Sequence, residues 1–261
     1  MLLESERSAG VLLLTLARPE ARNSLSQAMI EALQAAIDTA SQDTNLRAVI
    51  IAAKGPAFCA GHDLKELTAH RADADGGRAF TQLLMHQCSK LMRSIVQCPK
   101  PVIAAVEGPA SAAGCQLVAT CDLAIASASA SFATPGVNIG LFCSTPMVAL
   151  SRNISRKHAM EMLLLGDMLP APQAATYGLV NRVVAPGQSM AEALKIADII
   201  ATKPPVTLAI GKEAFYKQIE MPLADAYDYA AGVMVENMMH AESKEGIGAF
   251  IDKRAADWDK A

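Results

Sequence analysis

Two stretches of small residues have the spacing of a site for a negatively charged or polarised oxygen. The first, ASAAG at residues 110–114, follows the apolar run 101–106 and precedes a helical pattern at 115–121. A strand, a tight turn and a helix start present unpaired backbone N–H groups at the positive end of the helix dipole. Such groups bind an anion or a carbonyl oxygen without any side chain. Small residues also permit close packing of two elements, which is the alternative interpretation.

The second stretch has the same organisation. Residues 57–65 (AFCAGHDLK) follow a further apolar run at 48–52, so a strand again leads into a small-residue loop and a helix start. Two loops of this kind can each offer one N–H to the same oxygen, as in sites that stabilise an oxyanion. The pair therefore favours oxygen binding over simple close packing.

Three segments resemble the signature segments of the crotonase family, which includes enoyl-CoA hydratases and isomerases: FCAGHDLKEL, KPVIAAVEGPASAAGCQLVATCDLAIAS and SFATPGVNIGL. The resemblance extends from residue 16 to residue 258. Within the family, GHDLKEL, AAGCQLVA, FATPGVN, GLFCSTP and FYKQ are similar to one subgroup. The resemblance implies an α/β fold, a crotonase-like spiral of ββα turns with a C-terminal helical region that forms a homotrimer or a dimer of trimers.

The same resemblance implies that the substrate is an acyl-CoA thioester, whose oxygen is held by two backbone N–H groups. By position these groups belong to His62 and Ala113, where the family commonly has Gly at the second position. Coenzyme A enters as part of the substrate, and no separate cofactor is implied. The contacts to CoA that the resemblance implies come from Arg22, Ser24, Ala60, His62, Asp63, Leu64, Lys65, Phe250 and Lys253.

Both glutamates of the family's hydratases are absent. Hydratases carry one directly after the Gly-Cys of the helix start and another after the Pro of the following loop, where they handle a water and the α-proton. This sequence has Gln116 and Gly136 at those positions. An amide does not exchange a proton usefully, and Gly has no side chain. Ordinary enoyl-CoA hydration is therefore expected to be poor, and glutamate at both positions is expected to raise it.

Two other side chains offer chemistry. His62 has a pKa suited to proton transfer, although a loop histidine can also point elsewhere. Ser144 lies near the position of a nucleophilic aspartate in some dehalogenase members, but a helix cap before Pro146 is the alternative role. Three functions therefore stay open: acyl-CoA chemistry of the hydratase/isomerase class, acyl-CoA binding or regulation without catalysis, and another reaction such as thioester hydrolysis by His62.

Composition limits the partners. The 261 residues are 52 % apolar and 4 % aromatic, which predicts an aliphatic core. The net charge of −3 gives no indication of a nucleic-acid partner. No apolar run reaches the roughly 18 residues of a membrane span. The first ten residues have no signal-like or transit-like pattern, so a cytoplasmic protein is expected.

The six cysteines are scattered without a CxxC pair. In a chain of this length they are predicted to be reduced intracellular thiols, mostly in the core, and no metal site is expected.

Alternation of short apolar runs with helical patterns predicts an α/β core over residues 1–200, followed by a helical region at 201–261. Residues 69–77 are predicted to be a mobile connection. The Met-rich segment 233–239 fits either a face between subunits or an internal core. Predicted strands cover 11–16, 48–52, 101–106, 123–126 and 179–184; predicted helices cover 26–40, 78–97, 157–165, 172–178, 190–201, 205–216, 223–240 and 244–255.

Overall fold

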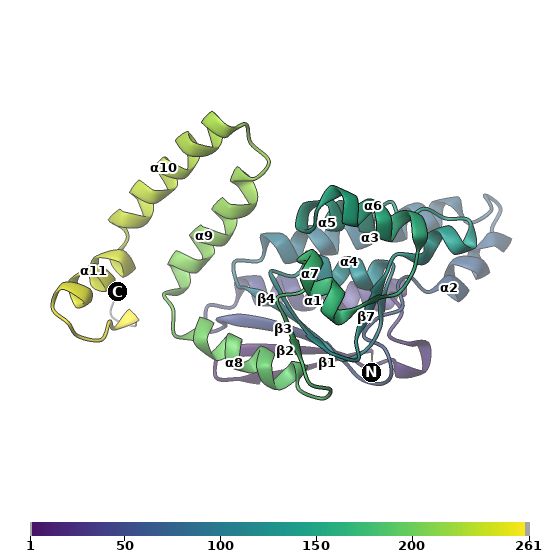
Figure 1. Cartoon of the computed structure of the whole chain (residues 1–261), viewed down its shortest axis with the longest axis horizontal. Helices are drawn as coiled ribbons and strands as arrows, with labels where there is room; N and C mark the ends of the chain where they lie inside the picture. The colour runs from purple at the N-terminus through teal and green to yellow at the C-terminus, as the bar shows by residue number, and fades with distance from the viewer. Residues whose placement is uncertain (1, 259–261) are drawn as a thin grey trace.

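The computed structural model describes residues 2–258, which surround a six-stranded sheet (Figure 1). β1 is antiparallel to β2, and every later strand pairs in parallel with its neighbour. The strands, in their order across the sheet, are β1 (Leu3–Ser8), β2 (Val11–Leu16), β3 (Ala48–Ala53), β4 (Val102–Val106), β6 (Leu123–Ser127) and β9 (Arg182–Val184).

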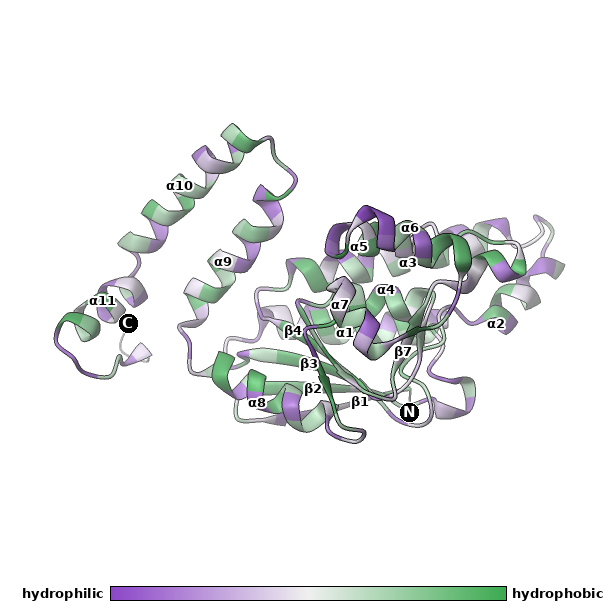
Figure 2. Ribbon diagram, in the orientation of Figure 1, coloured by the Kyte–Doolittle hydropathy of each residue, from purple (hydrophilic) through white to green (hydrophobic). Residues whose placement is uncertain are grey.

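Both faces of this sheet are covered, which explains why its central strands β3 and β4 are apolar throughout (Figure 2). Alternate residues of β3 and β4 belong to two separate clusters of buried side chains. One cluster includes Ala193 and Ala197 of α8 (Ser189–Ala201). The other includes side chains of α1 (Gln27–Gln42), α3 (Arg78–Gln97) and α4 (Ala113–Thr120). A sheet packed on both sides is a rigid base for the loops at its ends.

A second, three-stranded sheet completes the ββα turns. It consists of β5 (Ala110–Ser111), β7 (Ser131–Ala133) and β8 (Leu169–Pro170). The chain passes from β4 to β5 to α4, so one turn contributes a strand to each sheet and then a helix. An earlier turn runs from β3 through Cys59, which bridges to Ala110, into α2 (Leu64–Ala69). The predicted spiral of ββα turns is confirmed.

Several predicted elements need correction. Residues 69–77, predicted to be a mobile connection, begin with the end of α2 and the 3₁₀ helix His70–Ala72. The strand predicted at 179–184 is only Arg182–Val184, because Leu179 N–H donates to Ala174 O at 2.9 Å and so still belongs to the end of the preceding helix. Ser144 does not cap a helix, since Thr145 is the N-cap residue of α5. The sequence prediction missed β1, the three short strands, α5 (Pro146–Asn153) and the 3₁₀ helices Pro19–Ala21 and Pro135–Ile139.

The other predicted helices are present at nearly the expected bounds, except that the helix predicted at 244–255 lies at Ala241–Ile251. Ser26 caps α1 as predicted, because its side chain accepts a hydrogen bond from Met29 N–H. The helices beyond α5 are α6 (Arg156–Leu165), α7 (Ala171–Tyr177), α8, α9 (Pro205–Gln218), α10 (Leu223–Met239) and α11 (Ala241–Ile251).

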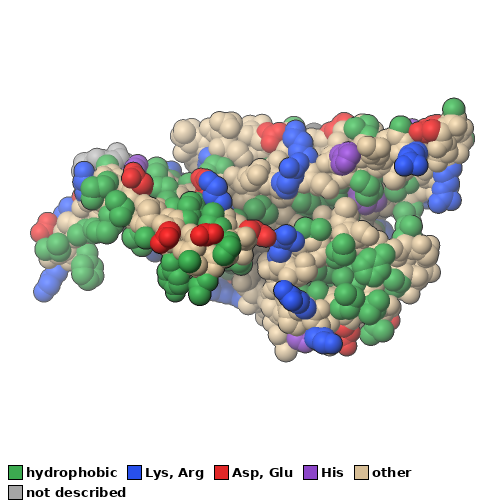
Figure 3. Space-filling model, turned by 90° about the horizontal axis from the view of Figure 1, so that it is seen from above, with side chains coloured by type: hydrophobic (Ala, Val, Ile, Leu, Met, Phe, Trp, Pro, Cys, Tyr) green, Lys and Arg blue, Asp and Glu red, His purple; other side chains and the backbone are tan. Residues whose placement is uncertain are grey.

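The three last helices form a C-terminal arm (α9–α11) that projects away from the sheet, at the left of Figure 1. Large apolar side chains gather on this arm (Figure 3). Leu223, Tyr227, Phe250 and Ile251 are each more than 70 % exposed in the single chain. Contiguous exposed apolar surface of this kind marks an interaction surface.

Candidate functional site

The N–H of His62 is fixed in direction by the backbone around it. Leu25 N–H donates to Gly61 O at 2.7 Å, and Asp63 N–H donates to Leu25 O at 3.3 Å. In a trans peptide the N–H lies opposite the C=O, so the His62 N–H points away from Leu25. It donates no hydrogen bond to any described residue. This donor is held in place and left free.

The N–H of Ala113 is equally free, at the start of α4. The preceding residue, Ala112, has φ 49° and ψ −117°, a conformation that favours Gly. Two bonds hold Ala112 there, because its N–H donates to Ala133 O at 2.9 Å and its carbonyl accepts Gln116 N–H at 3.0 Å. Ala113 itself does not adopt a positive φ, so Ala fits where the family commonly has Gly.

The two loops are in direct contact. A methyl group added to Gly61 would lie 3.3 Å from Ala113 N and 2.9 Å from Ala112 Cβ. A methyl group added to Gly114 would lie 2.1 Å from Cys59 O, so only Gly permits this approach. Two free N–H groups therefore belong to adjacent backbones, next to the N-terminus of a helix, where a polarised oxygen is favoured.

The side chain of His62 is largely enclosed. Both ring nitrogens are buried without a partner among residues 2–258. Burial lowers the pKa of His62 below its ordinary value, although the Leu25 backbone opposes this shift. The imidazole is therefore neutral at pH 7. A neutral, unpaired ring is chemically able to accept a proton, so the predicted proton-transfer role stays a prediction.

This lowered pKa predicts a pH effect on stability. The unfolded chain binds a proton at His62 more readily than the folded chain does. The contribution of the neutral ring to folding stability is therefore complete above about pH 6.5, and it is lost as pH falls through the lowered pKa of the folded state. We expect the Tm of His62→Gln to decrease less than that of the wild type between pH 7 and pH 5. In a chain of this size, a change in Tm of about 2–4 °C corresponds to a change of about 1 kcal/mol in the free energy of unfolding.

Thermal unfolding followed by circular dichroism measures the difference between the two pH profiles. His70→Gln is the control, because His70 pairs with Asp73 at the surface. Parallel profiles for the wild type and His62→Gln would show that the buried ring does not contribute in this way.

The two positions of the missing glutamates differ in their surroundings. Gln116 is 4 % exposed, and its side-chain oxygen has no hydrogen-bond partner in the described part of the chain. Gly136 is tightly enclosed: an added methyl group would lie 2.7 Å from Leu141 O and 2.9 Å from Cys143 Sγ. The Cys143 thiol therefore occupies the place of a side chain at position 136. Burial raises the pKa of this thiol, so it is protonated at pH 7.

The residues predicted to contact CoA fall into two groups. Those on the first loops lie together, since Ala60 N–H donates to Arg22 O at 3.0 Å and Ser24 Oγ donates to Asp63 Oδ2 at 3.3 Å. Asp63 also caps α2, beside exposed Leu64 and Lys65. Phe250 and Lys253 belong to the C-terminal arm, so a single chain does not bring them to these loops (Figure 1).

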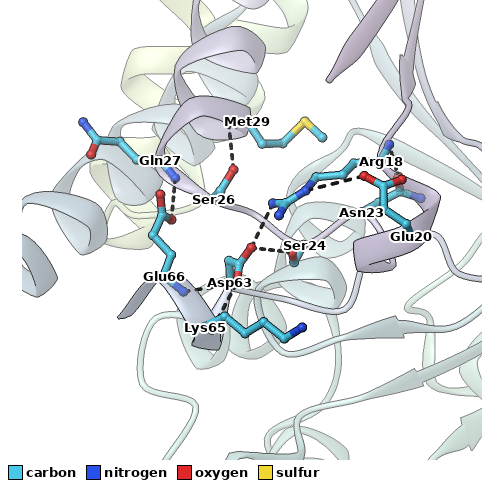
Figure 4. A network of polar contacts seen from close by, with 10 residues as sticks. All are labelled: Arg18, Glu20, Asn23, Ser24, Ser26, Gln27, Met29, Asp63, Lys65 and Glu66. Atoms are coloured by element: carbon cyan, nitrogen blue, oxygen red, sulfur yellow. Dashed lines mark hydrogen bonds and ion pairs between the residues drawn. The ribbon is translucent and has the colours of Figure 1, made fainter. Parts of the chain in front are cut away.

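Sequence reasoning missed three residues that hold the His62 loop (57–65) in place: Arg18, Asn23 and Glu66. Arg18 pairs with Asp63 at 2.8 Å, and Glu66 accepts Gln27 N–H at 2.9 Å (Figure 4). Asn23 is fully buried and donates to two backbone carbonyls. Nothing in the local sequence around these residues indicates their distant partners.

The fold is a spiral of ββα turns in which two loops with free N–H groups lie against one another. The family model for enoyl-CoA hydratase/isomerase matches residues 6–261, and the chain belongs to this family. Members of the family bind acyl-CoA thioesters. The subgroup resemblance is also confirmed by enoyl-CoA hydratase domain-containing protein 3 of rat, which is 44 % identical over 257 residues, 98 % of this chain and 84 % of the rat protein.

Solved structures of two relatives have the same fold as this chain. An enoyl-CoA hydratase of Mycobacterium smegmatis has a TM-score of 0.94 and 48 % identity, over 99 % of each chain. Human enoyl-CoA hydratase domain-containing protein 3 has a TM-score of 0.94 and 43 % identity, over 99 % of this chain and 100 % of the human chain.

The compartment differs from the sequence expectation of a cytoplasmic protein. The rat and human relatives are both named as mitochondrial proteins, which does not agree with a plain cytoplasmic assignment. Among residues 2–258, no helix combines the length and apolar character needed to cross a bilayer.

Proposed function

We propose that the chain binds an acyl-CoA thioester, with the thioester oxygen between the N–H groups of His62 and Ala113, and carries out acyl-CoA chemistry of the hydratase/isomerase class. The observation that carries this proposal is the pair of free N–H groups on touching backbones. Family membership supplies the class of ligand.

In this mechanism the two backbone N–H groups stabilise the negative charge that develops on the thioester oxygen. Withdrawing electron density toward the thioester oxygen acidifies the α-carbon and stabilises an enolate. Each N–H donor of such a site contributes about 10²–10³ in rate. The helix dipole of α4 acts in the same direction. The bonds that fix Ala112 keep the Ala113 donor aligned before substrate arrives, so no reorganisation is needed during the reaction.

The site lacks the two carboxylates that transfer protons in the family's hydratases. The Gln116 amide and the hydrogen of Gly136 replace two carboxylates, and the neighbouring thiol of Cys143 is protonated. These observations favour a second candidate function, in which the protein binds an acyl-CoA without converting it. The unpaired, neutral His62 ring favours a third, in which it assists thioester hydrolysis.

Calorimetry with a matched pair of ligands tests the oxygen site. Butyryl-CoA and S-butyl-CoA differ only in the carbonyl oxygen. Two hydrogen bonds contribute about 1 kcal/mol each, and about 1.4 kcal/mol is a tenfold change in affinity. We therefore expect butyryl-CoA to bind at least about tenfold more tightly.

Ala113→Pro removes one donor and is expected to reduce this preference, whereas Ala113→Gly keeps the N–H and should retain it. Equal affinities of the wild type for the two ligands would reject the oxygen site, and no binding of either would reject the CoA proposal. A turnover screen of enoyl-, 3-hydroxyacyl- and saturated acyl-CoAs then distinguishes catalysis from binding. Release of free CoA that disappears in His62→Gln would favour hydrolysis.

We also propose that the C-terminal arm joins copies of the chain into a homotrimer or a dimer of trimers. The exposed apolar side chains of α10 and α11 support this. In such an assembly Phe250 and Lys253 would reach the CoA of a neighbouring subunit. The names of the rat and human relatives favour a mitochondrial setting.

A further inference from the structure

One carboxylate joins residues 18–24 to the His62 loop at 57–65 (Figure 4). Asp63 Oδ2 accepts hydrogen bonds from Arg18 Nη1 at 2.8 Å and from Ser24 Oγ at 3.3 Å. Asp63 Oδ1 accepts the N–H groups of Lys65 at 3.1 Å and Glu66 at 3.3 Å. The side chains of Arg18, Ser24 and Asp63 form what we call the polar clamp.

The polar clamp fixes the alignment of residues 24–25 with residues 61–63, and this alignment orients the His62 N–H. Both peptide groups next to His62 are bonded to Leu25, through Gly61 O and Asp63 N–H. Leu25 directly follows Ser24, which the clamp fastens to Asp63. A shift between residues 24–25 and 61–63 would therefore rotate the peptide that carries the His62 N–H.

Arg18 supplies the charge that keeps the clamp closed. Its side chain is 28 % exposed and that of Asp63 is 10 % exposed, so water screens the pair only partly. Burial alone would raise the pKa of Asp63, but bonds from Glu66 N–H, Arg18 and Lys65 N–H outweigh burial and lower it. The backbone of Arg18 is fixed as well, because its N–H donates to the buried Asn23 side chain at 2.9 Å.

We propose that Arg18 is a positioning residue for the oxygen site: through Asp63 it sets where the His62 N–H meets the thioester oxygen. The inference rests on the proposed function, because it assumes that a thioester occupies the site. Arg18 acts through Asp63 and the Leu25 segment, with no contact to the ligand required.

The test uses a bound chromophore as a reporter of the oxygen site. The absorbance of 3-phenylpropenoyl-CoA moves to longer wavelength when hydrogen bonds polarise its thioester carbonyl, so the shift reports donor geometry at saturation. We expect a clear shift with the wild-type protein and a shift reduced by half or more with Arg18→Ala. Arg18→Lys keeps a positive charge but not the forked geometry, and should restore the shift partly.

Arg152→Ala is the matched control, because Arg152 pairs with Glu220 at the surface. Its shift should equal that of the wild type. Ser24→Ala removes one bond of the clamp without removing a charge, so it serves if Arg18→Ala does not fold, and its shift should also decrease.

A general loss of stability would lower the folded fraction without changing the spectrum of the ligand that is bound. A full shift at saturation in Arg18→Ala, or in Ser24→Ala where that variant is used, would therefore overturn the positioning role while leaving the proposed function intact. No shift and no binding with the wild type would instead overturn the proposed function.

Discussion

Gly136→Glu is expected to destabilise the protein and to fail as a replacement for a catalytic carboxylate. A Cβ at this position would lie 2.7 Å from Leu141 O, and Leu141 N–H is itself bonded to Gly136 O at 2.9 Å. The loop cannot retreat without breaking that bond. Overpacking of this kind costs about 1–3 kcal/mol, and burying a carboxylate adds to the cost. Urea denaturation measures the loss.

Gln116→Glu is the contrasting change, because glutamate has nearly the shape of glutamine. The wild type should hydrate crotonyl-CoA poorly, since each positioned acid or base contributes about 10²–10⁴ in rate. We expect Gln116→Glu to raise hydration above the wild-type level while remaining far below a hydratase with both carboxylates. The double variant should not exceed Gln116→Glu, because position 136 is enclosed, and this revises the expectation that hydration rises with glutamate at both positions.

The loss of enoyl thioester absorbance follows the reaction. Gln87→Glu is the control, because Gln87 lies on α3 and also has an unpaired side-chain oxygen. Rapid hydration by the wild type, unchanged in Gln116→Ala, would contradict this assignment. A well-folded, active Gly136→Glu protein would show that residues 140–143 rearrange to accommodate the new side chain.

Lys212→Met is expected to loosen the C-terminal arm from the core. Lys212 Nζ donates to Asp122 Oδ2 at 2.6 Å and to the carbonyls of Ile95 at 3.0 Å and Lys100 at 3.1 Å. Tyr216 OH donates to Asp122 Oδ1 at 2.9 Å. Removing the ammonium leaves an enclosed carboxylate without its cation, which typically costs about 3–5 kcal/mol.

Without this anchor, the C-terminal arm is no longer held at a fixed angle to the core. The proposed assembly through its apolar side chains should therefore also weaken. Urea denaturation and sedimentation velocity measure the two effects. Lys195→Met is the control, because Lys195 pairs with Glu192 at the surface. Combining Lys212→Met with Asp122→Asn should recover part of the stability. An unchanged midpoint and unchanged sedimentation for Lys212→Met would mean that this buried pair does not anchor the arm.

The sequence alone determined most of the helices, the central strands and the class of protein. Continuous apolar runs marked β3 and β4, because strands covered on both faces need no polar residues. Ser26 marked the start of α1, and small residues marked the two loops with free N–H groups. The absence of both glutamates needed only residue identities at known family positions.

The tertiary structure decided which distant residues act together. Arg18 and Asp63 are 45 positions apart, and Lys212 and Asp122 are 90 apart, so no local pattern joins either pair. The sequence could not show that Gly136 is enclosed by Leu141 and Cys143, or that Ala112 adopts a positive φ. Periodicity and residue type report the neighbourhood along the chain, whereas space and hydrogen-bond partners around a site depend on how separate elements pack.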